Sequence, residues 1–280
     1  MGFATSVALG LAGLFAIAWL MRAGARAMFA GSARAIAHDM PLTAAFGILV
    51  IGVYAAVAIA APALAPFPER EIVGGQFQAW SAAHPLGTDR IGRDMLSRLI
   101  YGARNTVGIA FATTALAFVV GAVLGLWAAL VGGWLDQGLS RFVDALMAIP
   151  ALIFSLLLLT IFGTSVITLI LVIAAVDATR VFRLARAVAQ GIVVMDYIEA
   201  AKLRGEGSWF LIRREILPNA MAPLVAEFGL RFCFVFLSIS SLSFLGLGIQ
   251  PPTADWGSMV KDNATLITFG DVTPLLPAGC

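Results

Sequence analysis

Long stretches of this 280-residue chain carry no charged side chain at all. Residues 3–21, 42–65, 105–135 and 145–176 contain neither Asp, Glu, Lys nor Arg. An α-helix needs about 20 apolar residues to cross the ~30 Å hydrocarbon layer of a membrane, so each stretch is long enough for a crossing. Only 12% of the chain is charged, against about 25% in soluble domains. The sequence therefore predicts a membrane protein and excludes a soluble globular enzyme.

The fourth stretch is too long for a single crossing and predicts two helices. Gly163, Thr164 and Ser165 lie near its middle and favour a turn, which gives spans at about 146–162 and 166–183. A last apolar run, about 220–248, is interrupted by two charged residues. The chain thus has six candidate spans. Its predicted fold is all-α, a polytopic bundle of transmembrane helices.

The first run, residues 3–21, has three interpretations. It is a genuine helix, an uncleaved signal-like segment, or a stretch upstream of a true start at Met21 or Met28. A cleaved signal is least favoured, because no basic residue precedes the apolar run. The expected organisation is an N-terminal hydrophobic segment with a basic loop, residues 1–40, followed by the main transmembrane domain, 41–280.

Lysine and arginine predict the orientation, because they are more frequent in cytoplasmic loops. With the loop 22–41 in the cytoplasm, eleven of the 18 basic residues are cytoplasmic and six lie outside, and Arg231 lies within a span. This places residues 66–104 in the periplasm, with five arginines, and residues 185–219 in the cytoplasm. The net charge of +2 excludes the basic surface of a nucleic-acid binder.

The polar segment between the fifth and sixth runs predicts a short helix outside the membrane. Residues 196–204 are rich in helix formers, and Gly205 and Gly207 predict its end, because glycine tolerates the left-handed conformation. Leu217-Pro218 predicts the start of a new element, since proline fits the first turn of a helix. Small residues within the helix let another protein approach its backbone, but an ordinary solvated loop explains the same composition equally well.

The order of residues in this segment resembles the EAA motif of binding-protein-dependent ABC importer permeases. In that family the motif forms the cytoplasmic coupling helix, which docks in a cleft on the ATPase subunit. The match departs at Glu215, just before Ile216-Leu217-Pro218, where an apolar residue is common. By resemblance, the coupling residues are Glu199, Ala200, Ala201, Lys202, Arg204, Gly205, Leu217 and Pro218.

Other motifs are similar to the peptide/nickel class of these permeases. Their order and spacing resemble the second, C-type permease subunit of dipeptide, oligopeptide or nickel importers, over about residues 41–280. The motifs are His84–Asp89, Gly92–Asp94 with Ser97-Arg98, Tyr101–Arg104, Gly132–Trp134 with Asp136, Leu242–Gly248, and Pro251-Pro252 with Trp256-Gly257.

The resemblance implies a permease subunit of a type I ABC importer in the bacterial inner membrane. Such a subunit moves peptides, nickel or similar small solutes by alternating access. The implied partners are a homologous permease subunit, two ABC ATPase subunits and a periplasmic substrate-binding protein. The chain has no phosphate-binding loop before Lys202 or Lys261, so we expect it to bind no ATP; ATP and Mg²⁺ belong to the partners.

The family has six spans with both ends in the cytoplasm. This chain reaches Cys280 where the family would begin its last span, so we expect five family spans and one additional N-terminal helix at residues 3–21. The two histidines, His38 and His84, are far apart and predict no metal site.

Glu227 and Arg231 lie one turn apart on one helix face. Uncompensated charge at mid-bilayer costs roughly 2.5–3.5 kcal/mol per residue on insertion scales, so the two should pair or face the interior. They form either a charged patch in the transport pathway or a structural pair near the interface, and we favour the structural pair.

The segment 84–104 mixes charges of both signs. By resemblance, Asp89, Arg93 and Asp94 belong to a periplasmic gate or a docking element for the binding protein. An interfacial helix anchored by arginine and Trp80 is the alternative. Trp256 is equally an interfacial anchor or part of the docking surface.

A function from another class is a self-contained secondary transporter or channel. It would need an ion-coupling carboxylate at mid-membrane, usually beside a broken helix. Glu227 is the candidate, but it lies near one end of its predicted span. A membrane-embedded enzyme would need a nucleophile–base or metal constellation, which the two distant histidines do not supply.

Overall fold

The computed structural model describes residues 41–269, 273 and 275–279, with a few isolated positions before residue 41. The predictions for residues 3–21 and for the basic loop that follows lie outside this range. The described residues contain no β-strand, only isolated bridges between Ile72 and Arg93 and between Thr88 and Asp94. The prediction of an all-α fold is confirmed. The chain divides into two compact units, Met1–Ala60 and Ala61–Cys280.

Helix α3, Leu42–Leu64, is the first fully described helix. Its 23 residues extend about 35 Å at 1.5 Å per residue, enough to cross the ~30 Å apolar layer. Pro62 lies in its last turn, and the helix ends two residues later. The predicted span 42–65 is therefore reproduced almost residue for residue.

The next span begins ten residues before the predicted start at Asn105. Asp94 is the reason, because its carboxylate accepts a hydrogen bond from the Ser97 N–H at 2.8 Å and caps a helix there. Gly132, with φ +66°, ends the rod. The rod consists of α4 (Met95–Gly102), the π-helical η1 (Ala103–Val107) and α5 (Gly108–Val131).

Helices α6, Gly133–Met147, and α7, Ala151–Phe162, meet at a bend of 88°. Pro150 precedes α7, and a proline disfavours helical backbone at the residue before it, which separates the two helices. The 12 residues of α7 extend only about 18 Å. The predicted span 146–162 is therefore the second half of a bent pair rather than one straight crossing.

The predicted turn at residues 163–165 is confirmed. Gly163 has φ +86°, and the Ser165 hydroxyl accepts a hydrogen bond from the Thr168 N–H at 3.1 Å, which caps the following helix. That helix, α8, runs from Val166 to Val193. The predicted span 166–183 covers its first two thirds.

A second continuous helical rod follows a short exposed helix. The short helix is α9, Asp196–Leu203, and the rod joins α10 (Ser208–Phe210), the π-helical η2 (Leu211–Ile216) and α11 (Leu217–Leu245). An α-helix does begin at Leu217 as predicted, but no loop precedes it. Pro218 has no N–H to donate, and the wider π-turns of η2 accommodate it without a break.

The chain then forms α12, Trp256–Asn263, η3, Ala264–Phe269, and α13, Leu275–Gly279. Among the described residues, three helices are long and apolar enough to cross a membrane: α3 and the rods 95–131 and 208–245, with the bent pair α6/α7 as a fourth. One of the six predicted spans, residues 3–21, lies outside the described residues, so the count of six stays a prediction. Helix α8 is also long enough to cross a membrane, but Asp177 and three arginines make it too polar to be counted among these helices.

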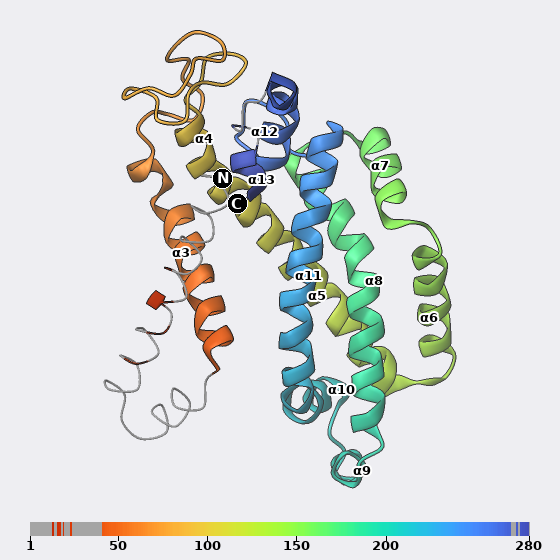
Figure 1. Ribbon diagram of the computed structural model, residues 1–280. Helices are drawn as coiled ribbons and strands as arrows, with labels where there is room; N and C mark the ends of the chain where they lie inside the picture. The colour runs from red at the N-terminus through yellow and green to blue at the C-terminus, as the bar shows by residue number, and fades with distance from the viewer. Residues whose placement is uncertain are drawn as a thin grey trace. The chain divides into compact units, whose positions relative to one another are not determined.

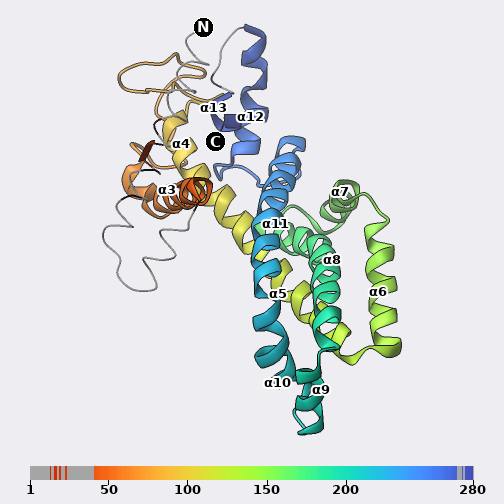
Figure 2. The ribbon, with the colours of Figure 1, turned by 60° about the horizontal axis from the view of Figure 1, so that its bottom comes forward.

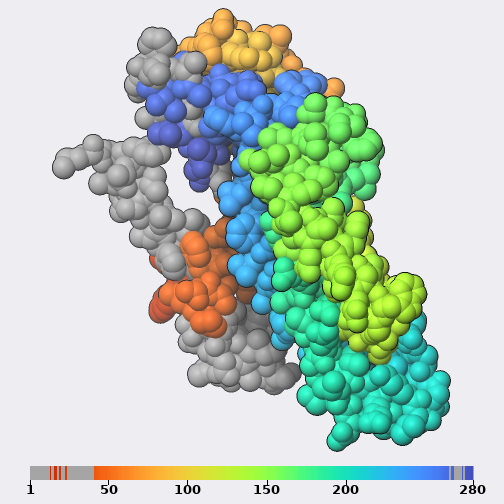
Figure 3. Space-filling model, turned by 90° about the vertical axis from the view of Figure 1, so that its right-hand side faces the viewer, coloured from red at the N-terminus to blue at the C-terminus, as the bar shows by residue number. Residues whose placement is uncertain are grey.

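The body of the second unit is built around the pairing of α5 with α8 (Figures 1 and 2). Gly121 and Gly125, one turn apart, let the two backbones approach closely. A Cβ at either position would lie 2.6 Å from a carbonyl oxygen of α8, that of Ala178 or Phe182. Small residues four apart are typical of close helix pairs in membranes. Helices α6 and α7 cover one face of this body (Figure 3).

Candidate functional site

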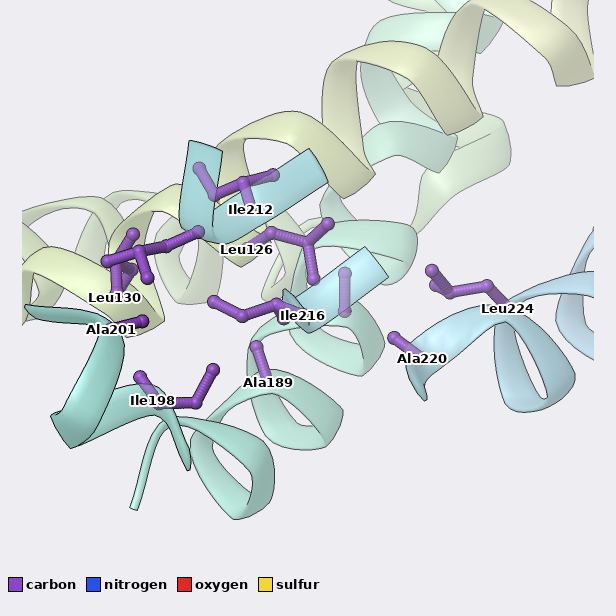
Figure 4. Packing of buried hydrophobic residues seen from close by; sticks show 11 residues of the cluster. Leu126, Leu130, Ala189, Ile198, Ala201, Ile212, Ile216, Ala220 and Leu224 are labelled. Atoms are coloured by element: carbon purple, nitrogen blue, oxygen red, sulfur yellow. The ribbon is translucent and has the colours of Figure 1, made fainter. Parts of the chain in front are cut away.

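Helix α9 lies at one end of the second unit, between α8 and α10 (Figures 1 and 2). Two of its side chains, Ile198 and Ala201, are completely buried and fix it to the body. They pack in an apolar cluster drawn from α5, α8, η2 and α11 (Figure 4). Its other buried members are Leu126, Leu130, Ala185, Ala189, Leu211, Ile212, Ile216, Ala220 and Leu224.

The opposite face of α9 is open. Glu199, Ala200, Lys202 and Arg204 are exposed, and Leu203 is 84% exposed. The two small residues therefore have different surroundings: Ala201 anchors the helix, and Ala200 faces outward. Leu203 is not among the predicted coupling residues, because its exposure depends on which side of α9 packs against the body.

More exposed hydrophobic side chains lie just before α9 and in its first turn. Val194, Met195 and Tyr197 are all exposed, Val194 at 78%. Apolar side chains gathered on a surface, rimmed by charges such as Glu199 and Lys202, are typical of a protein contact. The chemistry of this end of the molecule is therefore that of a binding surface.

The end of α9 has the predicted glycine conformation. Gly205 has φ +84°, its N–H donates to the Lys202 carbonyl, and the Glu206 N–H donates to the Ala201 carbonyl at 3.2 Å. This pattern satisfies the last carbonyls of the helix. Further along, Leu217 is half-buried and Pro218 is exposed, at the start of α11.

A chain of four charges connects α11 with α8. The Arg231 Nε lies 2.7 Å from the Glu227 Oε1, and its Nη1 lies 3.6 Å from the Asp177 Oδ1. The Arg180 Nη1 donates to the same Asp177 oxygen at 3.1 Å. The charges balance, and the Asp177 side chain is only 4% exposed. The sequence predicted that Glu227 and Arg231 share a face, but not that Asp177 faces them.

The predicted docking residues at the other end are buried. Asp89, Arg93 and Asp94 each have at most 4% of their surface exposed. The Arg93 Nε donates to the Asp89 Oδ2 at 2.7 Å, the Arg98 Nε lies 3.5 Å from that oxygen, and the His84 Nδ1 lies 3.1 Å from the Asp94 Oδ1. In this conformation these residues stabilise the interior of the segment before α4 and are not part of its exposed surface.

Trp256 also lies inside this end of the molecule. Its Nε1 donates to the Leu99 carbonyl at 3.0 Å, and its ring fills the space beside Gly102, where a Cβ would meet it at 2.5 Å. In Figures 1 and 3, the segment before α4 and the segment around α12 lie together, at the end opposite α9.

Further hydrogen bonds join these two segments to each other and to η1. Glu69 accepts from the Asn105 side chain at 2.8 Å and from the Ala254 N–H. The Thr106 hydroxyl donates to the Asp255 Oδ1 at 3.0 Å. Burial raises the pKa of Asp255, although hydrogen bonds to its carboxylate act in the opposite direction. Two stretches about 150 residues apart in sequence thus form one polar, cross-linked cap.

No group of three or more His, Cys, Asp or Glu side chains among the described residues is arranged to hold a metal ion. The predicted site residues thus fall into four places: α9 with its end at Gly205, the start of α11 at Leu217-Pro218, the charge chain between α8 and α11, and the buried cap. Of these, α9 presents the exposed apolar surface.

Comparison with known proteins identifies the family. Residues 121–277 match the family described as binding-protein-dependent transport system inner membrane component. The dipeptide transport system permease protein DppC of Alkalihalophilus pseudofirmus is 34% identical over 82% of this chain and 76% of its own length. DppC of Haemophilus influenzae is 34% identical over 78% and 77%. The glutathione transport system permease protein GsiD of Pectobacterium atrosepticum is 32% identical over 71% and 66%.

Both the family description and the long apolar helices place the chain in the inner membrane as a multi-pass transport component, which is not itself a catalyst. The chain therefore belongs to the family of binding-protein-dependent transport system inner membrane components.

Proposed function

We propose that this chain is the permease subunit of an ATP-driven importer for peptides. It pairs with a homologous permease subunit, and two ABC ATPase subunits bind ATP and Mg²⁺ on its cytoplasmic side. A periplasmic binding protein delivers the solute. The names of the dipeptide and glutathione permeases support peptides over nickel or another small solute.

The observation that carries this proposal is the exposed face of α9. A helix of eight residues is anchored by two buried side chains and presents Leu203 outward between charged residues. Such a helix can be gripped by a partner without disturbing the core beneath it. The ATPase subunit is the partner proposed here, and α9 is the coupling helix.

The residues of the motif then have two roles. Glu199, Ala200, Lys202 and Arg204, with the neighbouring Leu203, contact the ATPase. The remaining members hold the helix in place: Ala201 through the core, Gly205 through the turn, and Leu217 with Pro218 at the start of α11. The chain itself binds no cofactor in this proposal, because nucleotide chemistry belongs to the ATPase.

Alternating access follows if closure of the ATPases on ATP moves α9. Two conformations differ in their contacts with the ATPases, and nucleotide shifts the balance between them. At the opposite end, the buried cap presents its shape to the binding protein, while Asp89, Arg93, Asp94 and Trp256 maintain that shape. Glu227 and Arg231 act as a structural pair, since their charges are satisfied by each other and by Asp177.

The test is reconstitution of the chain with its partner subunits in proteoliposomes. Uptake of a labelled dipeptide should require the binding protein, both ATPases and ATP. Leu203→Asp should abolish co-purification of the ATPase subunits and uptake together, because it places a charge in an apolar contact. Ile72→Asp is the matched control, since Ile72 is 66% exposed at the opposite end and should leave ATPase binding unchanged.

Two results would overturn the proposal. If Leu203→Asp retained the ATPases at the wild-type ratio, α9 would not be the contact. If the purified chain moved the dipeptide down an ion gradient without ATPases, it would be a self-contained secondary transporter or channel instead.

A further inference from the structure

Helices α8 and α11 are connected along the chain through α9, and an ion pair far from α9 joins them as well. Asp177 on α8 lies about 24 Å along the helix from its last residue, Val193, at 1.5 Å per residue. Arg231 lies about 21 Å along α11 from Leu217. Their ion pair, with 3.6 Å between Nη1 and Oδ1, crosses from one helix to the other within the apolar body.

The contacts above and below this ion pair are apolar. On one side, Val172 and Ile173 of α8 belong to one cluster with Val235 and Ile239 of α11. On the α9 side, Ala189 of α8 belongs to another cluster with residues of η2 and α11. Apolar contacts are non-directional and tolerate a small slide of one helix along the other. A charge pair has a fixed partner, so it defines the register of α8 against α11.

Separating the two charges would also cost free energy, because both side chains are largely buried. The Asp177 side chain is 4% exposed and the Arg231 side chain 13%, and the Asp177 Oδ2 is buried without a hydrogen-bond partner. Removing Arg231 from Asp177 would weaken the compensation of a charge surrounded by apolar side chains, where charge is costly. Each ion is held from its own helix as well, Asp177 by Arg180 and Arg231 by Glu227.

We propose that Asp177 and Arg231 are positioning residues for transport: their ion pair locks α8 to α11, so that a displacement of α9 moves both helices as one body. This rests on the proposed coupling role of α9. Neither residue contacts the ATPase in this proposal; they act through the two helices that α9 connects. Without the pair, part of the motion of α9 is lost as sliding between α8 and α11.

The experiment measures solute moved per ATP hydrolysed by the complete reconstituted complex. Asp177→Asn, Arg231→Gln and the double variant form a cycle in which each change removes the same ion pair. Each single variant should lower the ratio about fivefold, the lower end of typical coupling between sites, while the ATPase rate stays near wild type. The double variant should lose no more than either single variant, because the pair is already absent.

A matched control exists on the same helix. Arg183 of α8 and Asp144 of α6 also form an ion pair, 3.9 Å long, but both side chains are about 60% exposed. Arg183→Gln with Asp144→Asn should leave the ratio unchanged, because exposed pairs contribute little. If a variant of Asp177 or Arg231 fails to assemble, Glu227→Gln provides the test instead. It removes only the ion pair between Glu227 and Arg231, and it should also lower the amount of solute moved per ATP.

Three results would overturn the inference. The first is an equal fall in uptake and ATP hydrolysis, which would make the pair merely structural. The second is an altered solute preference at an unchanged ratio, which would place the charges in the pathway. The third is an unchanged ratio in all variants. Failure of the wild-type complex to couple uptake to ATP would instead refute the proposed function.

Discussion

The close packing of α5 against α8 gives the sharpest stability prediction. Gly121→Ala adds one methyl group to the face of α5 that touches α8. That carbon would lie 2.6 Å from the Ala178 carbonyl oxygen and 2.7 Å from the Val181 Cβ. Ordinary contacts begin at 3.4 Å. The helices must therefore separate locally by about 0.8 Å, in an interior packed as densely as a crystal.

The cost follows from two opposing terms. Overpacking of a well-packed core costs roughly 1–3 kcal/mol, and alanine recovers about 0.5–1 kcal/mol of helix stability over glycine. The midpoints of these two ranges leave a net loss of about 1 kcal/mol for Gly121→Ala. The same reasoning holds for Gly125→Ala, whose added carbon would lie 2.6 Å from the Phe182 carbonyl oxygen.

The assay is thermal unfolding of the purified chain in detergent, followed by tryptophan fluorescence. For a chain of this size, each kcal/mol shifts Tm by about 2–4 °C, so either variant should lower Tm by several degrees. Gly108→Ala is the control on the same helix, because its added carbon would meet no atom within 4 Å, and its Tm should stay or rise. A rise in Tm for Gly121→Ala would refute the close approach of α5 and α8.

Three further predictions concern single contacts. Gly205→Ala forces a side chain into φ +84° at a cost of about 1–2 kcal/mol, which should speed tryptic cleavage at Arg204; unchanged cleavage would argue against a strained turn. Arg186→Lys replaces a two-pronged contact with Asp136 by a single one and should lower Tm by the equivalent of about 1 kcal/mol, whereas an unaltered Tm would mean that the pair is negligible. Because burial raises the pKa of Asp255, its stabilising contribution is present below its unfolded pKa of 3.8 and is lost as pH rises through the folded pKa. Asp255→Asn should therefore gain Tm relative to wild type as pH rises above about 4, and a difference that shrinks with rising pH would contradict the upward shift.

The elements that sequence reasoning placed correctly are those with local causes. The ends at Gly163 and Gly205 follow from glycine backbones with positive φ, and α3 follows from an uninterrupted apolar run. Such features depend on a few neighbouring residues, so they can be predicted without knowledge of the tertiary fold.

The elements that differ depend on distant residues. The rod begins at Met95, where Asp94 caps it, and continues through the predicted boundary at Asn105, whose side chain hydrogen-bonds to the distant Glu69 and Ala254. Likewise, Ala201 rather than Ala200 anchors α9, because Ala201 packs against the apolar cluster of distant residues beneath the helix. A pattern within eight residues cannot contain that information.

The same limit affects the orientation of the chain, which was predicted by counting basic residues. The five arginines in residues 66–104 argue against this orientation, since they lie on the side that should be poor in positive charge. The structure weakens this objection, because Arg93 and Arg98 are buried against Asp89. Charges neutralised inside a folded cap differ from charges in an open loop. Cysteine labelling at Leu203 and Ile72 from either side of the membrane would test the orientation directly, and labelling of Leu203 from the periplasm would reverse it.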